Sequence, residues 1–116
     1  MKKEDIPSFI SSFFKKEYKE EILIKPDEVK RYSYPKSNKY YSPDIEVKHS
    51  RGTDFICIEK KFKKSDIQGI IQKWILISNE ARKQQGKLWV FTKSSEENKF
   101  QGIIDKLGFQ ADLQVY

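Results

Sequence analysis

The residues whose types and spacing can do chemistry are two carboxylates and a lysine, on the two arms of one predicted β-hairpin. The segment 42–62 reads SPDIEVKHSRGTDFICIEKKF, and two runs rich in β-branched and aromatic residues flank Arg51-Gly52. A symmetric turn at this dipeptide puts Asp44 directly opposite Glu59, with Lys61 two residues further on the same face. Like charges that face each other destabilise a ladder, so the carboxylate pair predicts a metal site.

The same register makes an apolar surface on the other face of the hairpin. Ile45 and Val47 face Ile58 and Ile56 there, as residues that cover a core would. A slip of one residue would turn Asp44 to the apolar face, so the register decides the interpretation. A second interpretation stays open, in which chance placed two acidic residues in one sheet and Lys61 is their counter-ion.

Composition indicates one small domain with a polyanionic partner. The 116 residues fit a single domain over 1–116, and 37% hydrophobic residues can supply its core. The net charge is +6 and most basic residues are lysines, which suit phosphate contacts better than base reading. The longest purely apolar stretch, 74–77, is too short to span a bilayer, so we expect no membrane partner. The single Cys57 excludes an internal disulfide, and we expect a cytoplasmic protein.

Hydrophobic periodicity and turn chemistry predict the order α-β-β-β-α-β-α-β. The first helix covers about 6–20 with Asp5 as its cap, a strand follows near 21–24, and 30–41 is a loop or irregular edge strand. After the hairpin we expect a helix over 66–85, a strand buried on both faces over 87–92, a further helix and a half-buried strand over 111–115. This order favours a three-layer α/β domain with a mixed sheet.

Four local signals set the predicted ends of the two later helices. Ser65 with Gln68, and Ser94 with Glu97, have the spacing of capping boxes at the two helix starts. Gly86 and Gly108 are the predicted C-terminal stops. Trp74 and Trp89 fall on apolar faces and are predicted to be core.

The four residues Pro43, Asp44, Glu59 and Lys61, followed by a helix and a buried strand, resemble the PD-(D/E)XK nuclease superfamily. The resemblance covers 42–92, and within the superfamily the segment 56–64 with the following helix and strand is most similar to archaeal-type Holliday junction resolvases. It implies a restriction-endonuclease-like α/β/α fold with a central mixed β-sheet and a metal-dependent DNA endonuclease. It further implies branched duplex DNA as substrate and a homodimer, in the cytoplasm of a prokaryote or, if encoded by a virus or plasmid, of its host.

The resemblance also assigns roles to individual residues. Asp44 and Glu59 would bind Mg²⁺ or Mn²⁺, with the main-chain carbonyl of Lys60 as a further ligand. Lys61 would orient the attacking water or stabilise the developing charge on the phosphate. The related resolvases carry a glutamate early in their first helix, which this chain lacks, and only acidic residues near the end of that helix (Glu17, Glu20, Glu21) can substitute. Gln72 is a further candidate for a substrate contact, although a solvated position on the helix face also fits it.

A second frame also spells the motif, with Pro26-Asp27 and Glu46-Val47-Lys48. The strand that carries Glu46 runs into another strand, whereas the family places a helix after its Glu-x-Lys strand, and only Glu59 satisfies that condition. The middle residue of the triplet is commonly apolar in the family, and Lys60 departs from this pattern.

Cations and tyrosines near the proposed site are candidates for nucleic-acid binding, and an ordinary charged loop is the alternative. The candidate cations are Lys30, Arg31, Lys36, Lys39, Arg51, Lys63 and Lys64, and the tyrosines available for stacking are Tyr32, Tyr34, Tyr40 and Tyr41. The only histidine, His49, lies by the predicted turn, where an exposed position or a phosphate contact both fit. Two further functions stay open, a restriction-like or repair nuclease of the same superfamily and a non-catalytic nucleic-acid-binding protein with its fold.

Overall fold

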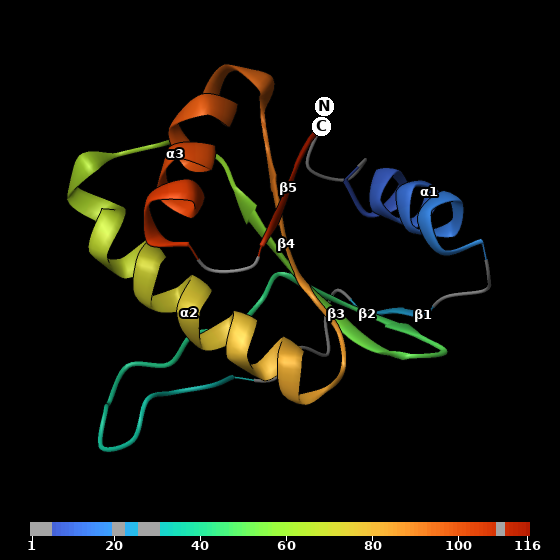
Figure 1. The fold of residues 1–116 in the computed structure, drawn as a ribbon, viewed down its shortest axis with the longest axis horizontal. Helices are drawn as coiled ribbons and strands as arrows, with labels where there is room; N and C mark the ends of the chain where they lie inside the picture. Colours follow the sequence, from blue (N-terminus) through green and yellow to red (C-terminus); the bar gives the residue numbers. More distant parts are fainter. Residues whose placement is uncertain (1–5, 20–22, 26–30, 109–110) are drawn as a thin grey trace.

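The structure is a computed structural model, and it describes residues 6–19, 23–25, 31–108 and 111–116 (Figure 1). Its elements are α1 (Ile6–Tyr18), β1 (Leu23–Lys25), β2 (Ile45–His49), β3 (Gly52–Glu59), α2 (Ile67–Lys83), β4 (Leu88–Thr92), α3 (Glu97–Leu107) and β5 (Asp112–Val115). Short 3-10 turns, Lys64–Asp66 and Ser94–Glu96, precede α2 and α3. The predicted order of helices and strands is confirmed.

One mixed five-stranded sheet organises the molecule, with its strands in the order β1-β2-β3-β4-β5. The first three strands are antiparallel neighbours, and β3, β4 and β5 run parallel to one another. The parallel pairs follow from the helices α2 and α3, since a crossover helix brings the next strand back in the same direction. The expectation of a mixed α/β fold with a mixed sheet is confirmed.

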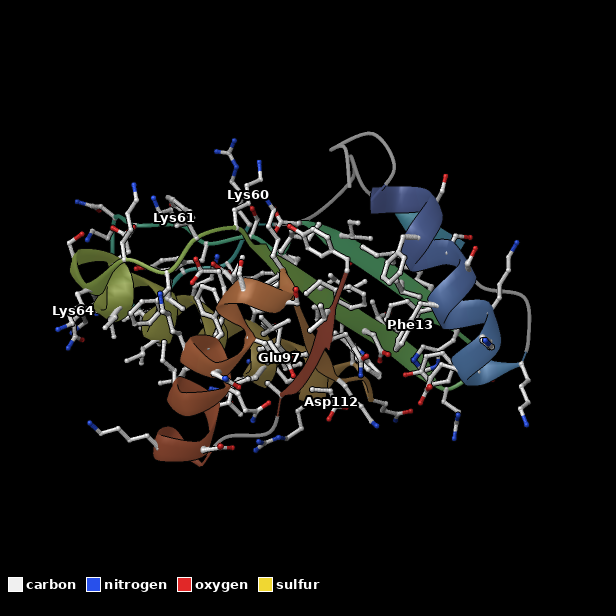
Figure 2. All side chains as sticks on the ribbon, turned by 90° about the horizontal axis from the view of Figure 1, so that it is seen from above. Phe13, Lys60, Lys61, Lys64, Glu97 and Asp112 are labelled. Carbon is white, nitrogen blue, oxygen red and sulfur yellow. The ribbon has the colours of Figure 1, made fainter. Side chains whose placement is uncertain are left out.

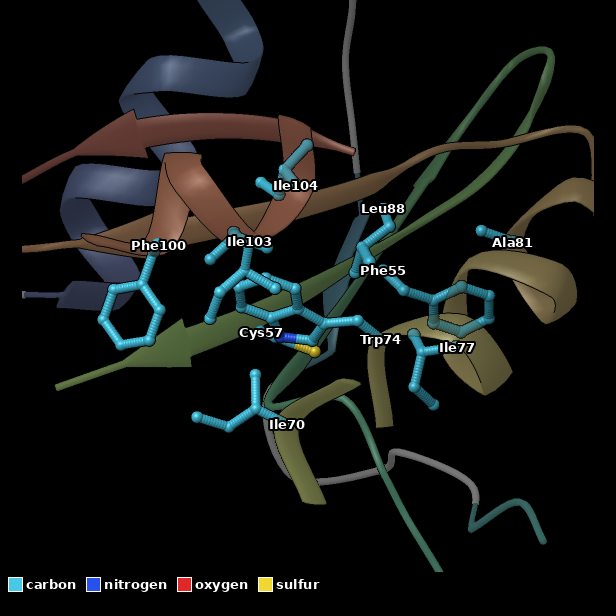
Figure 3. Packing of buried hydrophobic residues seen from close by; sticks show 11 residues of the cluster. Phe55, Cys57, Ile70, Trp74, Ile77, Ala81, Leu88, Phe100, Ile103 and Ile104 are labelled. Atoms are coloured by element: carbon cyan, nitrogen blue, oxygen red, sulfur yellow. The ribbon is translucent and has the colours of Figure 1, made fainter. Parts of the chain in front are cut away.

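Helices cover both faces of this sheet. Alternate residues of β3 and β4 divide between two clusters, with Phe55 and Val90 against α2 and α3, and Ile56 and Phe91 against α1. Figure 3 shows Phe55, Cys57, Trp74 and Phe100 packed together in the first cluster. Cys57 is fully buried, and burial raises the pKa of its thiol, which makes it a core residue rather than a nucleophile.

The register of the β2–β3 hairpin differs from the predicted one by two residues. Ile45 pairs with Ile56 and His49 with Gly52, so the tight turn is Ser50-Arg51 and not Arg51-Gly52. Asp44 therefore lies opposite Cys57 rather than opposite Glu59. A shift of two residues keeps every side chain on its predicted face, so Asp44 and Glu59 still share one face of the sheet.

Neither capping box forms. Ser65 and Ser94 lie in the 3-10 turns, and the residues that precede the helices, Asp66 and Glu96, make no side-chain capping bond to any described residue. The C-terminal stop at Gly108 is confirmed, since this residue adopts the left-handed conformation with φ of 67°. The predicted cap Asp5 lies outside the described residues.

Gly52 and Gly86 form a glycine seam, where the start of β3 meets the end of α2. A Cβ on Gly86 would lie 1.7 Å from the carbonyl oxygen of Thr53, and one on Gly52 would lie 2.2 Å from that of Gln84. The left-handed residue after α2 is Gln85, with φ of 60°, so the predicted stop at Gly86 serves close packing instead. The seam fixes α2 against the sheet.

The segment 31–41 is an irregular loop, as predicted, closed by one isolated bridge between Tyr32 and Tyr41. It leaves the sheet just before Asp44 and projects below α2 in Figure 1. Among the helices that the structure describes, none is long and apolar enough to cross a membrane.

Candidate active site

Asp44 closes the open end of the β2–β3 ladder. Its backbone N–H donates to the carbonyl oxygen of Ile56 at 2.8 Å, and its carboxylate oxygen Oδ2 accepts from the backbone N–H of Ile58 at 2.7 Å. The side chain is exposed, and among the described residues no hydrogen bond to its other oxygen, Oδ1, is recorded. One oxygen thus accepts from the backbone, and the exposed side chain can present the other to a ligand.

Glu59, the last residue of β3, is the buried partner in this site, with 8% of its surface exposed. Its oxygen Oε1 receives the indole N–H of Trp74 at 3.3 Å and the ammonium group of Lys73 at 2.5 Å. Both donors come from α2, which the parallel crossover places over this face of the sheet. Within the described residues, no hydrogen bond to the second oxygen, Oε2, is recorded.

The ammonium group of Lys73 has a raised pKa in this site. Burial lowers the pKa of its ammonium group, whereas attraction to Cys57, Glu59 and Asp44 raises it, and the net result is a pKa above the ordinary value. Glu59 contacts this ammonium group directly, and Asp44 adds the smallest of these influences on its pKa. The sequence predicts a metal ion at this carboxylate pair with Lys61 beside it; the metal site stays a prediction, and the lysine that contacts Glu59 is Lys73.

Lys60 and Lys61 follow the end of β3 in irregular chain and are exposed. Figure 2 shows Lys60, Lys61 and Lys64 toward one end of the molecule, opposite in this view to Phe13 on α1. Among the described residues, no ion pair of Lys61 is recorded. The catalytic role of Lys61 and the metal-ligand role of the Lys60 carbonyl stay predictions, and Lys73 is the lysine that contacts a carboxylate.

The Mg²⁺ or Mn²⁺ site expected at Asp44 and Glu59 stays a prediction. Within the described part of the chain, no group of three or more His, Cys, Asp or Glu residues could hold a metal ion. Mg²⁺ keeps several waters and binds through one or two carboxylates plus substrate phosphate. Asp44 and Glu59 are the two carboxylates of this prediction. A four-ligand structural zinc site has no counterpart among the described residues.

Of the other acidic positions, Glu17 lies away from this site, whereas Glu46 pairs with Phe55 and so lies on the same sheet face as Asp44. Glu17 is exposed on α1, the helix that packs on the opposite face of the sheet, so it lies away from Glu59. Glu46 of the second frame is buried on β2, and β2 continues into β3 rather than into a helix. Glu20, Glu21, the Pro26-Asp27 pair and Lys30 lie outside the described residues.

Gln72 anchors the loop 31–41 to α2, beside Lys73. Its side-chain oxygen accepts from the hydroxyl of Tyr41 at 2.8 Å, and its backbone carbonyl accepts from the hydroxyl of Tyr34 at 2.7 Å. Tyr32 packs edge-on against Phe55. Tyr40 differs from these three, with 64% of its surface exposed. Of the tyrosines considered for stacking, Tyr40 is the one whose ring is available.

The candidate cations divide into two regions. Arg31, Lys36 and Lys39 are exposed on the loop that Gln72 anchors, and Lys63 and Lys64 are exposed just before α2. Arg51 instead lies at the hairpin turn, with its guanidinium 5.6 Å from the ring centre of Tyr18. Because β3 rises about 3.3 Å per residue, the turn lies roughly 23 Å from Glu59. The structure does not bring Arg51 to the acidic site.

A second carboxylate centre, around Asp54, escapes sequence reasoning. Asp54 is fully buried, and its oxygens receive the indole N–H of Trp89 at 2.8 Å, the backbone N–H of Lys87 at 2.9 Å and the hydroxyl of Tyr18. Nε2 of His49 lies 3.1 Å away, and that side chain is only 3% exposed, which excludes the exposed position, one of the two alternatives that the sequence left open for His49. This centre joins α1, the hairpin and β4, and an acidic residue inside an apolar strand is its signal in the sequence.

A cavity lies elsewhere, at the beginnings of β4 and β5. It has a volume of about 520 Å³, and its lining consists of Ser78, Arg82, Gly86, Lys87, Leu88, Ala111 and Asp112. Glu59 is at the opposite end of the parallel strands, and ligands of open α/β sheets bind at that carboxyl end. We place the candidate site at Asp44, Glu59 and Lys73 rather than at the cavity.

Comparisons of the chain with protein-family models, curated proteins and solved structures found no match. Function is therefore inferred from the geometry of the site.

Proposed function

We propose that the chain is a metal-dependent endonuclease that hydrolyses phosphodiester bonds in DNA. One observation carries this proposal. Asp44 and Glu59 share a sheet face at the carboxyl end of β3, with a lysine ammonium 2.5 Å from Glu59 and under the influence of both carboxylates. Two carboxylates and a lysine are the groups that hold a divalent ion and stabilise the charge on a reacting phosphate.

In this proposal Asp44, Glu59 and the main-chain carbonyl of Lys60 hold Mg²⁺ or Mn²⁺. The bound ion supplies charge neutralisation at the phosphate and lowers the pKa of its water. Lys73 would be free to donate to a phosphate oxygen if a bound ion took its place at Glu59, because its ammonium and the ion would compete for the same carboxylate. Lys61 remains the alternative donor that the motif resemblance implies.

The proposed substrate is branched duplex DNA, and the proposed assembly is a homodimer. Both come from the resemblance to Holliday junction resolvases, which also implies the restriction-endonuclease-like three-layer arrangement. Exposed cations on the loop 31–41 and before α2 support a DNA backbone contact beside the site. Paired symmetrical nicks need two active sites, hence the dimer.

Cleavage of defined DNA substrates tests this proposal. The protein is incubated with linear, flapped and four-way DNA in Mg²⁺ and, separately, in Mn²⁺. We expect nicking of the four-way substrate to exceed that of linear duplex. Equal cleavage of both substrates would favour a restriction-like or repair nuclease of the same superfamily. If no substrate were cleaved in either metal, the proposed endonuclease activity would be wrong.

The second candidate function is a non-catalytic nucleic-acid-binding protein. The observation that favours it is the Lys73 ammonium, which already neutralises Glu59 as a metal ion would. Titration calorimetry separates the two functions. Intact DNA binding without uptake of Mn²⁺ would favour the binding protein, whereas Mn²⁺ uptake that Glu59→Gln removes would favour the nuclease.

A further inference from the structure

Thr92 is a buried hydroxyl beside Glu59 that no part of the proposed mechanism uses. It is the last residue of β4 and pairs in register with Glu59, the last residue of β3. Paired residues of neighbouring parallel strands point to the same face, and Thr92 follows Leu88 and Val90, which pack on the α2 side. Its side chain therefore lies on the same face as the Glu59 carboxylate, one strand away.

The hydroxyl of Thr92 lacks a partner. The residue is fully buried, and its Oγ1 makes no hydrogen bond to any described residue. A buried hydroxyl without a partner costs free energy, and native structures keep few such groups. Valine has nearly the same shape and no hydroxyl, and it would fill this strand position without that cost. The hydroxyl therefore calls for an explanation outside packing.

We propose that Thr92 is a positioning residue of the same site, whose hydroxyl donates to Oε2 of Glu59 when that carboxylate binds a divalent cation. Adjacent parallel strands lie about 4.8 Å apart, so a hydroxyl and a carboxylate at paired positions are within hydrogen-bond reach. A bond to a ligating carboxylate fixes its orientation, as partners of metal ligands commonly do. This inference rests on the proposed function and adds a residue that its motif does not contain.

The test compares Thr92→Val and Thr92→Ser with the wild type, with Mn²⁺ as the probe. We expect Thr92→Val to weaken Mn²⁺ binding by about 10-fold in titration calorimetry and Thr92→Ser to restore it. In metal-free urea unfolding, Thr92→Val should have a midpoint equal to or above that of the wild type, because the unpartnered hydroxyl is gone. Ser78→Ala is the matched control, since the Ser78 hydroxyl donates to the Ile75 carbonyl at 3.0 Å at the other end of the strands.

Three outcomes would overturn the inference in different ways. Wild-type protein that binds Mn²⁺ with the same affinity as Thr92→Val would overturn the role of Thr92 and leave the proposed metal site standing. Wild-type protein that takes up no Mn²⁺ would overturn the metal site and the inference together. Loss of stability in Thr92→Val without loss of Mn²⁺ affinity would make Thr92 a packing residue only.

Discussion

Asp54 and Glu59 lie five residues apart on the same strand and face opposite sides of the sheet. Each accepts a hydrogen bond from a tryptophan indole, Trp89 for Asp54 and Trp74 for Glu59. Asp54 also takes a tyrosine hydroxyl and a backbone N–H, with His49 beside it, and these partners occupy both of its oxygens. Glu59 has its recorded partners on one oxygen, and one of them is a lysine.

The difference teaches how one kind of side chain serves two purposes. A buried carboxylate with donors on both oxygens stabilises the fold, since each donor would lose its partner if the carboxylate were removed. A carboxylate at the end of a strand, with one oxygen available and a movable ammonium on the other, can exchange its partner for a ligand. Asp54 is thus interpreted as structural and Glu59 as functional, and the following experiments can break or sharpen that distinction.

We expect the largest effect, the loss of DNA cleavage, in the variants Glu59→Gln and Asp44→Asn. Each removes a metal-binding charge and should reduce cleavage to background. Stability should change little in Asp44→Asn, whose Asn carbonyl can still accept from the backbone N–H of Ile58. It should change more in Glu59→Gln, which leaves the ammonium group of Lys73 without its carboxylate. Cleavage assays and urea unfolding check the two parts. If Glu46→Gln inactivated as strongly as Glu59→Gln, the second frame would be the true site.

The stability counterpart is Asp54→Ala. This change leaves the indole of Trp89, the hydroxyl of Tyr18 and the backbone N–H of Lys87 without their acceptor. We expect a loss of about 3 to 5 kcal/mol in the free energy of unfolding. Asp54→Asn, which keeps one acceptor oxygen, should lose less. A stability loss in Asp54→Ala no larger than that of Glu59→Gln would remove the distinction between the two carboxylates.

Replacement of the two candidate lysines sharpens the functional side. Lys73→Met should reduce cleavage by about 100-fold, because its ammonium is the donor nearest to the carboxylates. Lys61→Met should have the smaller effect, since Lys61 is exposed beyond the end of β3. Single-turnover cleavage rates compare the two variants. The reverse order would assign the catalytic role to Lys61, as the motif resemblance implies.

A smaller effect is expected for Tyr40→Ala, on DNA affinity rather than chemistry. Stacking of one unpaired base on an aromatic ring contributes about 1 to 3 kcal/mol, so binding of single-stranded or branched DNA should weaken. Tyr40→Trp should keep the affinity. Tyr34→Phe is the control, because it removes only the hydroxyl that donates to the Gln72 carbonyl. Binding is measured by fluorescence anisotropy in EDTA, and an unchanged affinity in Tyr40→Ala would exclude stacking at this ring.

The smallest effect concerns alkaline stability at the Asp54 centre. Burial, together with the hydrogen bond and charge of Asp54, raises the pKa of Tyr18. Unfolded protein loses this phenolic proton near pH 10 while folded protein keeps it, so unfolding releases a proton and stability falls as pH rises above 10. Tyr18→Phe should flatten that fall, whereas Tyr40→Phe, which removes an exposed hydroxyl, should not. Urea unfolding between pH 8 and pH 11 measures both slopes, and parallel slopes for wild type and Tyr18→Phe would contradict the expectation.

The faces of the elements can be predicted from the sequence more securely than their contacts. Period-two alternation placed Asp44 and Glu59 on one face even though the register differs by two residues, since a shift of two preserves the face. The residues of the turn could not be predicted. Gly52 is required by its close approach to the carbonyl oxygen of Gln84 and not by the turn, and that contact exists only in the folded chain. The capping boxes failed for a local reason, since 3-10 turns begin both helices.

The site's missing members share one cause. Lys73 contacts Glu59 from α2, which begins after the motif. The two residues are 14 positions apart, and no local sequence pattern predicts that they meet. Trp74 and Trp89 were predicted as core and are buried, but periodicity cannot say which polar group an indole N–H will meet. Gln72 likewise becomes an anchor only because the loop 31–41 returns across α2.

The glycine seam has a mechanical consequence for α2. The C-terminal end of this helix is held where Gly86 meets the backbone of Thr53, and its first half is held by the contact between Lys73 and Glu59. The two attachments differ in kind, since the first is steric and permanent and the second is ionic and exchangeable. If a ligand displaced Lys73, the seam and the buried α2 side chains of Trp74 and Ile77 would still hold the helix on the sheet, so the exchange would be confined to the lysine side chain.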